Sequence, residues 1–355
     1  MLRTAASRAG YDPSRRLAQD GRPAAIRAVA IGGGTGLPAV LRGLSSLDYA
    51  SGLDRRNPDW PTAVVTVMDD GGSSGRLRES LGVLPPGDIR NCLAALVRTP
   101  TSLSGVLHDR LTADNGEAGH PIGNLLLAAM STTEGDLLRA VARLGSQIGI
   151  IGRVLPATLE NVHLTASFED GSAVRGETAI TARGGRIRKL SLERPVHPAP
   201  EVIEALINAD LIVVGPGSLY TSILPNLLVN GVAATLSGVQ ATRVYVANLM
   251  TEPGETDGYS VLDHLRVIRE HTGFDLFDYV LVNRAPLPDD AVAKYASDGA
   301  ATIDIPDSLG GASRARVVTG DLATVTETGQ IRHDPDALAR ALTALPNPSQ
   351  PATRS

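Results

Sequence analysis

The sequence predicts an α/β fold with a doubly wound, mainly parallel sheet, and three features of the chain lead to this class. Short runs of small and β-branched residues recur, such as Ala28–Ile31 and Asp210–Val214, and this composition is typical of strands buried on both faces. Apolar residues with helical spacing follow these runs, as in Leu37–Leu47. Glycine- and hydroxyl-rich turns join each strand to its helix. Strands that alternate with helices in this way form parallel sheets covered by helices on both faces.

The composition excludes several classes of protein. A net charge of −5 and an aromatic content of 3% argue against a nucleic-acid partner, because basic surfaces and stacking aromatics dominate such interfaces. No apolar run reaches the roughly 18 residues of a membrane span, so we expect none. The single cysteine, Cys92, excludes an intramolecular disulfide framework and fits a reducing compartment.

We expect one folded domain over residues 27–345, between a disordered leader (1–26) and a disordered tail (346–355). Within the domain, residues from about 148 to 192 alternate apolar and polar positions and contain turns at Asp170-Gly171 and Gly184-Gly185. This pattern predicts a β-rich insertion of hairpins without a catalytic group. Its predicted strands are Val154–Thr158, Val162–Glu169, Ala173–Ile180 and Ile187–Leu192.

The first strand, Ala28–Ile31, leads into a glycine turn and the helix Leu37–Leu47. This unit resembles the start of a dinucleotide-binding fold, in which helix amides face an anion. The candidate ligand residues of the turn are Gly33, Gly34, Thr35 and Gly36.

The next strand, Val64–Met68, ends on two acids and a Gly/Ser loop, and a Pro-Pro-Gly-Asp turn then starts the helix Ile89–Val97. Backbone amides, hydroxyls and guanidinium groups suit phosphate, whereas carboxylates suit ribose hydroxyls or Mg²⁺. We therefore expect a ligand site here, with Asp69 and Asp70 as candidate metal ligands. The other candidates are Gly71, Gly72, Ser73, Ser74, Arg76, Asp88 and Asn91.

The rest of the chain repeats this pattern. Asn124 stands before a predicted helix, Leu125–Met130, where it either caps the helix or contacts a ligand. A helix is predicted over Pro200–Asn208, and helix 260–271 separates the last two strands. Strands end at Val214, Ala247 and Val282, and the polar residues beyond them add these candidates: Gly215, Gly217, Ser218, Tyr220, Thr221, Ser222, Asn248, Thr256 and Tyr259. Because ligands bind beyond the carboxyl ends of such strands, we expect five polar segments to meet at one edge. They are 32–36, 69–76, 215–222, 248–259 and 283–284.

Six stretches of the sequence resemble the bacterial gluconeogenesis factor family (YvcK-like), which belongs to the superfamily of 2-phospho-L-lactate transferase (CofD-like). They are GGGTGL (32–37), VMDDGGSSGRLR (67–78), PPGDIRNCL (85–93), GHPIGNLLLAA (119–129), GPGSLYTSILPNLLV (215–229) and ANLMTEPGETDGY (247–259). The resemblance covers roughly residues 27–285. It implies a Rossmann-like α/β/α core, a cytoplasmic location and binding of UDP-sugars such as UDP-N-acetylglucosamine. It also implies a regulatory role in cell shape and peptidoglycan synthesis during gluconeogenic growth, and with it protein partners in cell-wall regulation.

Three functions follow from these observations. The first is a regulator that binds a nucleotide sugar, without an established reaction. The second is a transferase that moves a phospholactyl group from a nucleotide diphosphate donor, such as a GDP derivative, to a deazaflavin with Mg²⁺. The scarcity of aromatic residues weighs against a platform for that acceptor. The third is an NAD(P)-binding protein, although the spacing from the glycine turn to Asp69 exceeds the usual ~20 residues. We also expect a homo-oligomer.

Overall fold

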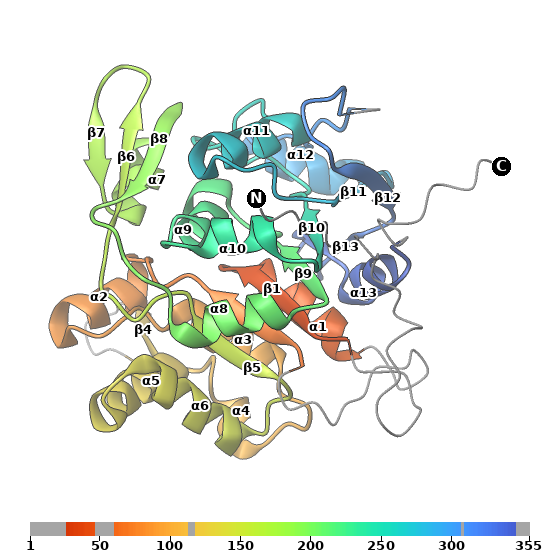
Figure 1. The fold of residues 1–355 in the computed structure, drawn as a ribbon. Helices are drawn as coiled ribbons and strands as arrows, with labels where there is room; N and C mark the ends of the chain where they lie inside the picture. Colours follow the sequence, from red (N-terminus) through yellow and green to blue (C-terminus); the bar gives the residue numbers. More distant parts are fainter. Residues whose placement is uncertain (1–25, 47–59, 113–117, 307–308, 346–355) are drawn as a thin grey trace, which may run out of the picture.

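The computed structural model describes residues 26–46, 60–112, 118–306 and 309–345 (Figure 1). The predicted tail, and the leader except its last residue, lie outside the described residues.

A seven-stranded parallel sheet forms the centre of the fold and confirms the predicted α/β class. The strand order is β12-β11-β10-β9-β1-β2-β5, and every neighbouring pair is parallel. The strands are β1 (Ala28–Gly32), β2 (Thr62–Val65), β5 (Arg153–Pro156), β9 (Leu211–Val214), β10 (Thr242–Val246), β11 (Tyr279–Asn283) and β12 (Arg316–Gly320). Their carboxyl ends therefore lie along one edge.

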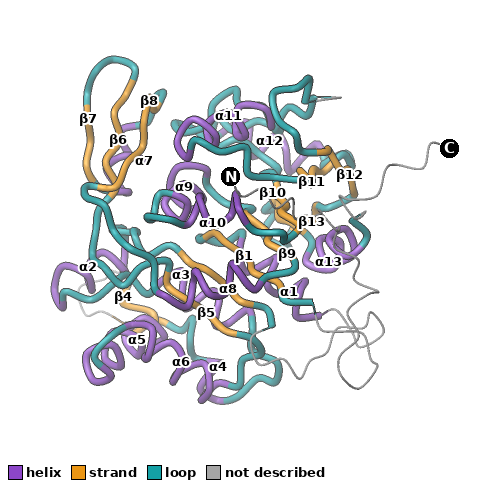
Figure 2. The backbone as a smooth tube through the Cα atoms, in the orientation of Figure 1, coloured by secondary structure: helices purple, strands orange, loops and turns teal. Residues whose placement is uncertain are grey.

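Helices cover both faces of the sheet, as Figure 2 shows. Alternate strand residues enter two separate cores: Val29 and Ile31 belong to one, and Ala28 and Ala30 to the other. The first core includes α8 (Pro200–Asn208), α9 (Leu224–Leu227), α10 (Val232–Gly238) and α11 (Val261–Thr272). The second includes α1 (Leu37–Ser46), α3 (Gly87–Ala95), α5 (Ile122–Glu134), α6 (Leu137–Ile148) and α13 (Pro335–Thr343). Burial on both faces explains why the strands contain continuous apolar runs.

The predicted insertion contains a three-stranded antiparallel sheet of order β7-β6-β8, which projects from the main body in Figure 1. Its elements are β6 (Leu164–Phe168), β7 (Ala173–Arg175), α7 (Glu177–Arg183) and β8 (Ile187–Leu192). Two predictions were wrong here. The strand expected at Val154–Thr158 is β5, an edge strand of the main sheet. The strand expected to run to Ile180 ends at Arg175, and α7 begins because Asp70 accepts hydrogen bonds from its first backbone amides.

The Gly/Ser segment after Asp70 also differs from its prediction as a loop. It forms the first turn of α2 (Gly72–Leu81), which Gly72 enters with a φ of +48°, a conformation that favours glycine. The glycine turn at residues 215–218 follows β9, and a short π-helical segment, η3 (Leu219–Ile223), comes after this turn.

The chain beyond residue 286 contains α12 (Asp289–Ser297), β12, α13 and the hairpin β13 (Ala323–Val325)–β14 (Ile331–His333). The remaining elements are α4 (Ser102–Gly105) and the hairpin β3 (Arg110–Thr112)–β4 (Ala118–Pro121). Among the described residues no single helix is long and apolar enough to cross a membrane. One bent pair, Leu219–Leu227 with Val232–Gly238, meets the criteria of length and composition together, and most of its residues are buried inside the protein.

Candidate functional site

A cavity of about 760 Å³ lies at the carboxyl edge of the sheet. Its walls come from the turns after β1, β9 and β10, from the segment after β2, from α7 and from the β13–β14 hairpin. Ten of the predicted site residues line it: Gly34, Thr35, Gly36, Asp69, Asp88, Gly217, Ser218, Thr221, Ser222 and Asn248. Four of the five predicted polar segments therefore contribute to one space. The fifth does not, because Asn283 instead binds the backbone at Leu322 and Ala285.

The two glycine turns pack directly against each other. A Cβ atom at Gly36 would lie 2.3 Å from the carbonyl oxygen of Pro216. Asn248 joins the second turn to β10, because its side chain accepts from Gly217 N and donates to Gly217 O, both at 2.9 Å. Only residues without side chains at these places allow the two backbones to approach the cavity together.

The same cavity is rich in buried carboxyl groups. Burial raises the pKa of Asp88 to about 6, and it raises the pKa values of Glu177 and Glu252 to about 7. Burial also raises the pKa values of Asp69 and Glu255. Neighbouring carboxylates add to most of these shifts. The site thus holds carboxyl groups that can change protonation near neutral pH.

Two of the predicted phosphate donors already bind these acids. Gly34 N donates to Asp88 Oδ2 at 2.7 Å. The Ser218 hydroxyl contacts Glu252 and lies 2.8 Å from Glu255 Oε2. A hydroxyl has one hydrogen, so it can donate to only one of these carboxyl groups at a time. A ligand in this part of the cavity therefore competes with carboxylates for the turn amide and the hydroxyl.

The cavity also has a wall that the sequence analysis missed. Arg42 of α1, Tyr295 of α12 and Arg332 and His333 of β14 belong to its lining. Burial lowers the pKa of His333 to about 4, so this imidazole is neutral at pH 7. No local motif marks these residues. Arg332 and His333 reach the site because the C-terminal hairpin folds back over the sheet edge.

A second compartment of about 280 Å³ adjoins the cavity, and Asp69 and Asp88 line both. Six other predicted residues line the compartment: Gly71, Gly72, Ser73, Ser74, Asn91 and Asn124. Arg90 and Arg110 add positive charge to its wall. The two spaces therefore meet at the carboxyl groups of Asp69 and Asp88, which form an acidic boundary between them.

Asp70 is not among the residues that line either space, and it holds the insertion in place. Its carboxylate accepts from Glu177 N at 3.0 Å and Thr178 N at 2.8 Å, and it lies 3.5 Å from His163 Nδ1. Burial opposes ionisation of Asp70, but the hydrogen bonds from α7 outweigh it and lower its pKa. The residue thereby places Glu177 in the wall of the main cavity.

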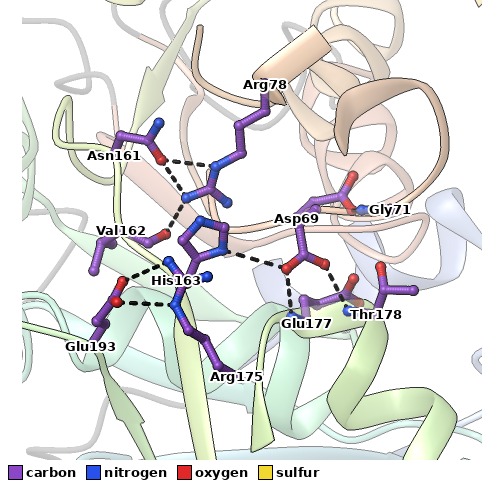
Figure 3. Close-up of polar contacts among 11 residues, drawn as sticks. Asp69, Gly71, Arg78, Asn161, Val162, His163, Arg175, Glu177, Thr178 and Glu193 are labelled. Carbon is purple, nitrogen blue, oxygen red and sulfur yellow. Dashed lines mark hydrogen bonds and ion pairs between the residues drawn. The ribbon is translucent and has the colours of Figure 1, made fainter. Parts of the chain in front are cut away.

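Beside this contact, a buried arginine ties α2 to the insertion (Figure 3). Arg78 is 5% exposed and donates to Asn161 Oδ1 and, at 2.6 Å, to Val162 O. Arg175, at the end of β7, forms an ion pair with Glu193, directly after β8. The segment predicted to lack functional groups is thus bonded to the site through α2.

The geometry does not support Asp69 and Asp70 as a shared metal site. Asp69 accepts from Gly71 N, whereas Asp70 is committed to α7. Among the described residues, no group of three or more His, Cys, Asp or Glu side chains could hold a metal ion. A cation here would need ligand atoms from a bound molecule.

The remaining candidates lie elsewhere. Tyr220 and Tyr259, whose hydroxyls are 3.0 Å apart, line a third cavity of about 250 Å³ between the insertion and α11. Thr256 is buried and accepts from Glu252 N, and Gly33 and Gly215 shape the turns without lining a described cavity. Arg76 lies exposed on α2.

Comparison with known proteins agrees with this architecture. The family model for 2-phospho-L-lactate transferase CofD matches residues 28–323. The chain belongs to the CofD family. This CofD-family chain is 40% identical to the gluconeogenesis factor of Halalkalibacterium halodurans, over 88% of the chain and 94% of the relative. It is 41% identical to the gluconeogenesis factor of Bacillus subtilis, over 88% of the chain and 96% of that protein.

The fold also matches a solved structure. The crystal structure of a UPF0052 family member from Bacillus halodurans superposes on this CofD-family chain with a TM-score of 0.83 and 38% identity. The match covers 89% of this chain and 99% of the other. The resemblance noted in the sequence motifs is therefore confirmed, for both the family and the fold.

Proposed function

We propose that this protein binds a nucleotide sugar of the UDP-N-acetylglucosamine type in the main cavity and acts as a cytoplasmic regulator of growth on gluconeogenic carbon sources. Through this ligand the protein would influence cell shape and peptidoglycan synthesis together with protein partners. The observation that carries the proposal is the cavity of about 760 Å³, which is lined by two glycine turns and buried carboxyl groups. Its size lies within the range of ~300–1,000 Å³ that is usual for small-molecule sites.

The lining matches the parts of such a ligand. Backbone amides at the turns after β1 and β9 suit a diphosphate. Carboxyl groups such as Glu252 and Glu255 suit the hydroxyls of a ribose or a hexose, because a carboxylate accepts two or more hydrogen bonds. Arg42 and Arg332, which also line the cavity, would offset the negative charge of the phosphates.

A Mg²⁺ ion would assist this binding. Mg²⁺ in proteins is held mainly by one or two carboxylates, water and substrate phosphates. Asp69 and Asp88, which line both spaces, are the carboxylates placed for this role. The ion would neutralise the repulsion between a diphosphate and the acidic boundary.

The second candidate is a transferase, in keeping with the family model. The observation in its favour is the second compartment, which meets the main cavity at Asp69 and Asp88 and offers room for an acceptor. Turnover of a lactyl-diphospho-nucleoside with a deazaflavin alcohol would decide for this candidate.

Isothermal titration calorimetry tests the main proposal. UDP-N-acetylglucosamine, GDP and NAD are each titrated into the full chain, with and without Mg²⁺. We expect micromolar binding of the UDP-sugar, weakened at least tenfold by Asp88→Asn and by Ser218→Ala. Glu79→Gln on the exposed side of α2 is the matched control and should bind normally. Tighter binding of NAD or GDP than of the UDP-sugar would contradict the proposal.

A further inference from the structure

The second compartment contains a serine–histidine pair. Ser73 is the second residue of α2, and its Oγ lies 2.8 Å from Nδ1 of His120 on β4. Ser73 is 9% exposed and lines the compartment. Two motifs separated by more than forty residues, Gly71–Gly75 and Gly119–Asn124, are thus brought together at one hydroxyl.

A chain of hydrogen bonds holds the Ser73 oxygen in place. Arg90 donates to Asn124 Oδ1 at 2.9 Å, which turns the amide nitrogen of Asn124 toward Ser73. That nitrogen donates to Ser73 Oγ at 3.0 Å, and Asn124 is only 2% exposed. The oxygen of Ser73 is therefore an acceptor for Asn124, and its hydrogen is donated to His120 Nδ1 in the tautomer that carries its proton on Nε2. Covalent catalysis usually places a nucleophile within hydrogen-bond reach of a base, and a third group orients the base. The Ser73–His120 pair meets the first condition, and Asn124 orients the nucleophile.

The surroundings favour the neutral form of His120, and they also favour negative charge on the oxygens of a phosphoryl group. Burial lowers the pKa of His120, and the positive charges of Arg76 and Arg110 lower it further. A hydrogen bond with the Ser73 backbone opposes this shift, but the net pKa is lowered, which favours the neutral imidazole that a general base requires. The first amides of α2 have no side-chain cap and adjoin the compartment, as does the guanidinium of Arg90. Helix amides and arginine groups stabilise the oxygens of a phosphoryl group.

We propose that Ser73 is a nucleophile for phosphoryl transfer, with His120 as its general base, and that the donor is a phosphoanhydride such as a nucleoside diphosphate derivative. The identity of the donor rests on the proposed function, since the main cavity adjoins the compartment at Asp69 and Asp88. As the bond from Ser73 Oγ to phosphorus forms, the bridging P–O bond of the anhydride breaks. The Ser73 proton passes to His120 and then to the departing phosphate oxygen. Water or an acceptor hydroxyl then attacks the phosphorus, and the bond from Ser73 Oγ to phosphorus breaks. The proton of the attacking group passes through His120 to Ser73 Oγ, which restores the hydroxyl.

A fluorophosphonate probe tests the nucleophile without knowledge of the natural donor. The full chain is incubated with the biotin-linked probe, whose P–F bond breaks as the bond to the serine oxygen forms, with release of HF. Intact mass and peptide mapping should give one adduct, on the peptide that ends at Arg76. Ser73→Ala should abolish the adduct and His120→Gln should slow its formation at least tenfold. Ser80→Ala is the matched control, because Ser80 lies on the same helix and its hydroxyl donates to Arg76 O.

Several outcomes are decisive. An adduct rate no higher than that of the urea-unfolded chain, or a rate unchanged by His120→Gln, would overturn the proposal. If Ser73→Ala melts early, Ser73→Cys keeps a nucleophile at the same place. Iodoacetamide should alkylate the thiol introduced by that substitution faster than the buried Cys92, and His120→Gln should slow this alkylation.

The UDP-sugar titration of the same preparation separates the two proposals. An adduct on Ser73 without nucleotide binding refutes the proposed function and supports the nucleophile. Nucleotide binding without an adduct overturns the nucleophile and leaves the proposed function standing.

Discussion

Replacing Gly36 by alanine should separate the two glycine turns that form the floor of the main cavity. The added Cβ would lie 2.3 Å from Pro216 O and 2.8 Å from Pro216 C. The distance to the oxygen is more than 1 Å shorter than 3.4 Å, where ordinary van der Waals contact begins. Both neighbours are backbone atoms, so no side-chain rotation can relieve the clash. Overpacking of this kind costs about 1–3 kcal/mol. We expect the free energy of unfolding to fall by that amount and UDP-sugar affinity to fall at least tenfold.

Urea denaturation and calorimetric titration of the same samples measure both effects. Gly238→Ala is the matched control, because its added Cβ would meet nothing within 4 Å and the residue is the last of α10, without a positive φ. Alanine is favoured over glycine in a helix by roughly 0.5–1 kcal/mol, so this variant should be as stable as the parent or more so. A Gly36→Ala protein with unchanged stability and affinity would refute the packing of the two turns and their joint role in binding.

Three further predictions concern Asp70, Glu252 and Arg332. Asp70→Ala removes the acceptor of two α7 amides, so the free energy of unfolding should fall by about 1–3 kcal/mol. Amide hydrogen exchange in α7 should become faster. Faster exchange that is confined to other elements would contradict this prediction. Glu252 has a folded pKa of about 7, above its usual 4.5, so its protonated form stabilises the fold fully below pH 4.5 and this contribution disappears as pH rises through 7. Glu252→Gln should therefore flatten the loss of stability between pH 5 and 8, by at most about 3 kcal/mol, and an unchanged pH profile in urea melts would count against it. Arg332→Ala should weaken UDP-sugar binding tenfold or more in calorimetry without lowering the melting temperature, and normal affinity would remove Arg332 from the ligand wall.

The sequence was sufficient for the parts of the fold that local patterns encode. Continuous apolar runs such as Leu211–Val214 predicted buried parallel strands, and the glycine turns beyond β1 and β9 lie at the carboxyl edge as expected. Parallel pairing alone brings such turns to the same edge.

Other features depend on tertiary contacts that no local pattern records. The sequence could not distinguish Asp69, which faces the cavities, from Asp70, which holds α7, because the difference arises when the insertion docks. The composition of Gly71–Gly75 predicts a loop since glycine and serine are weak helix formers, yet Arg78 and Asn124 fix the segment as α2. Arg332 enters the site only through the path of the C-terminal hairpin.

A crystal structure of the full chain with UDP-N-acetylglucosamine and Mg²⁺ tests the central claim most directly. We predict the two phosphates between Gly34–Gly36 and Gly217–Ser218, with the sugar beside the carboxyl groups of the main cavity. Ligand density in the cavity lined by Tyr220 and Tyr259, with the glycine turns empty, would contradict it.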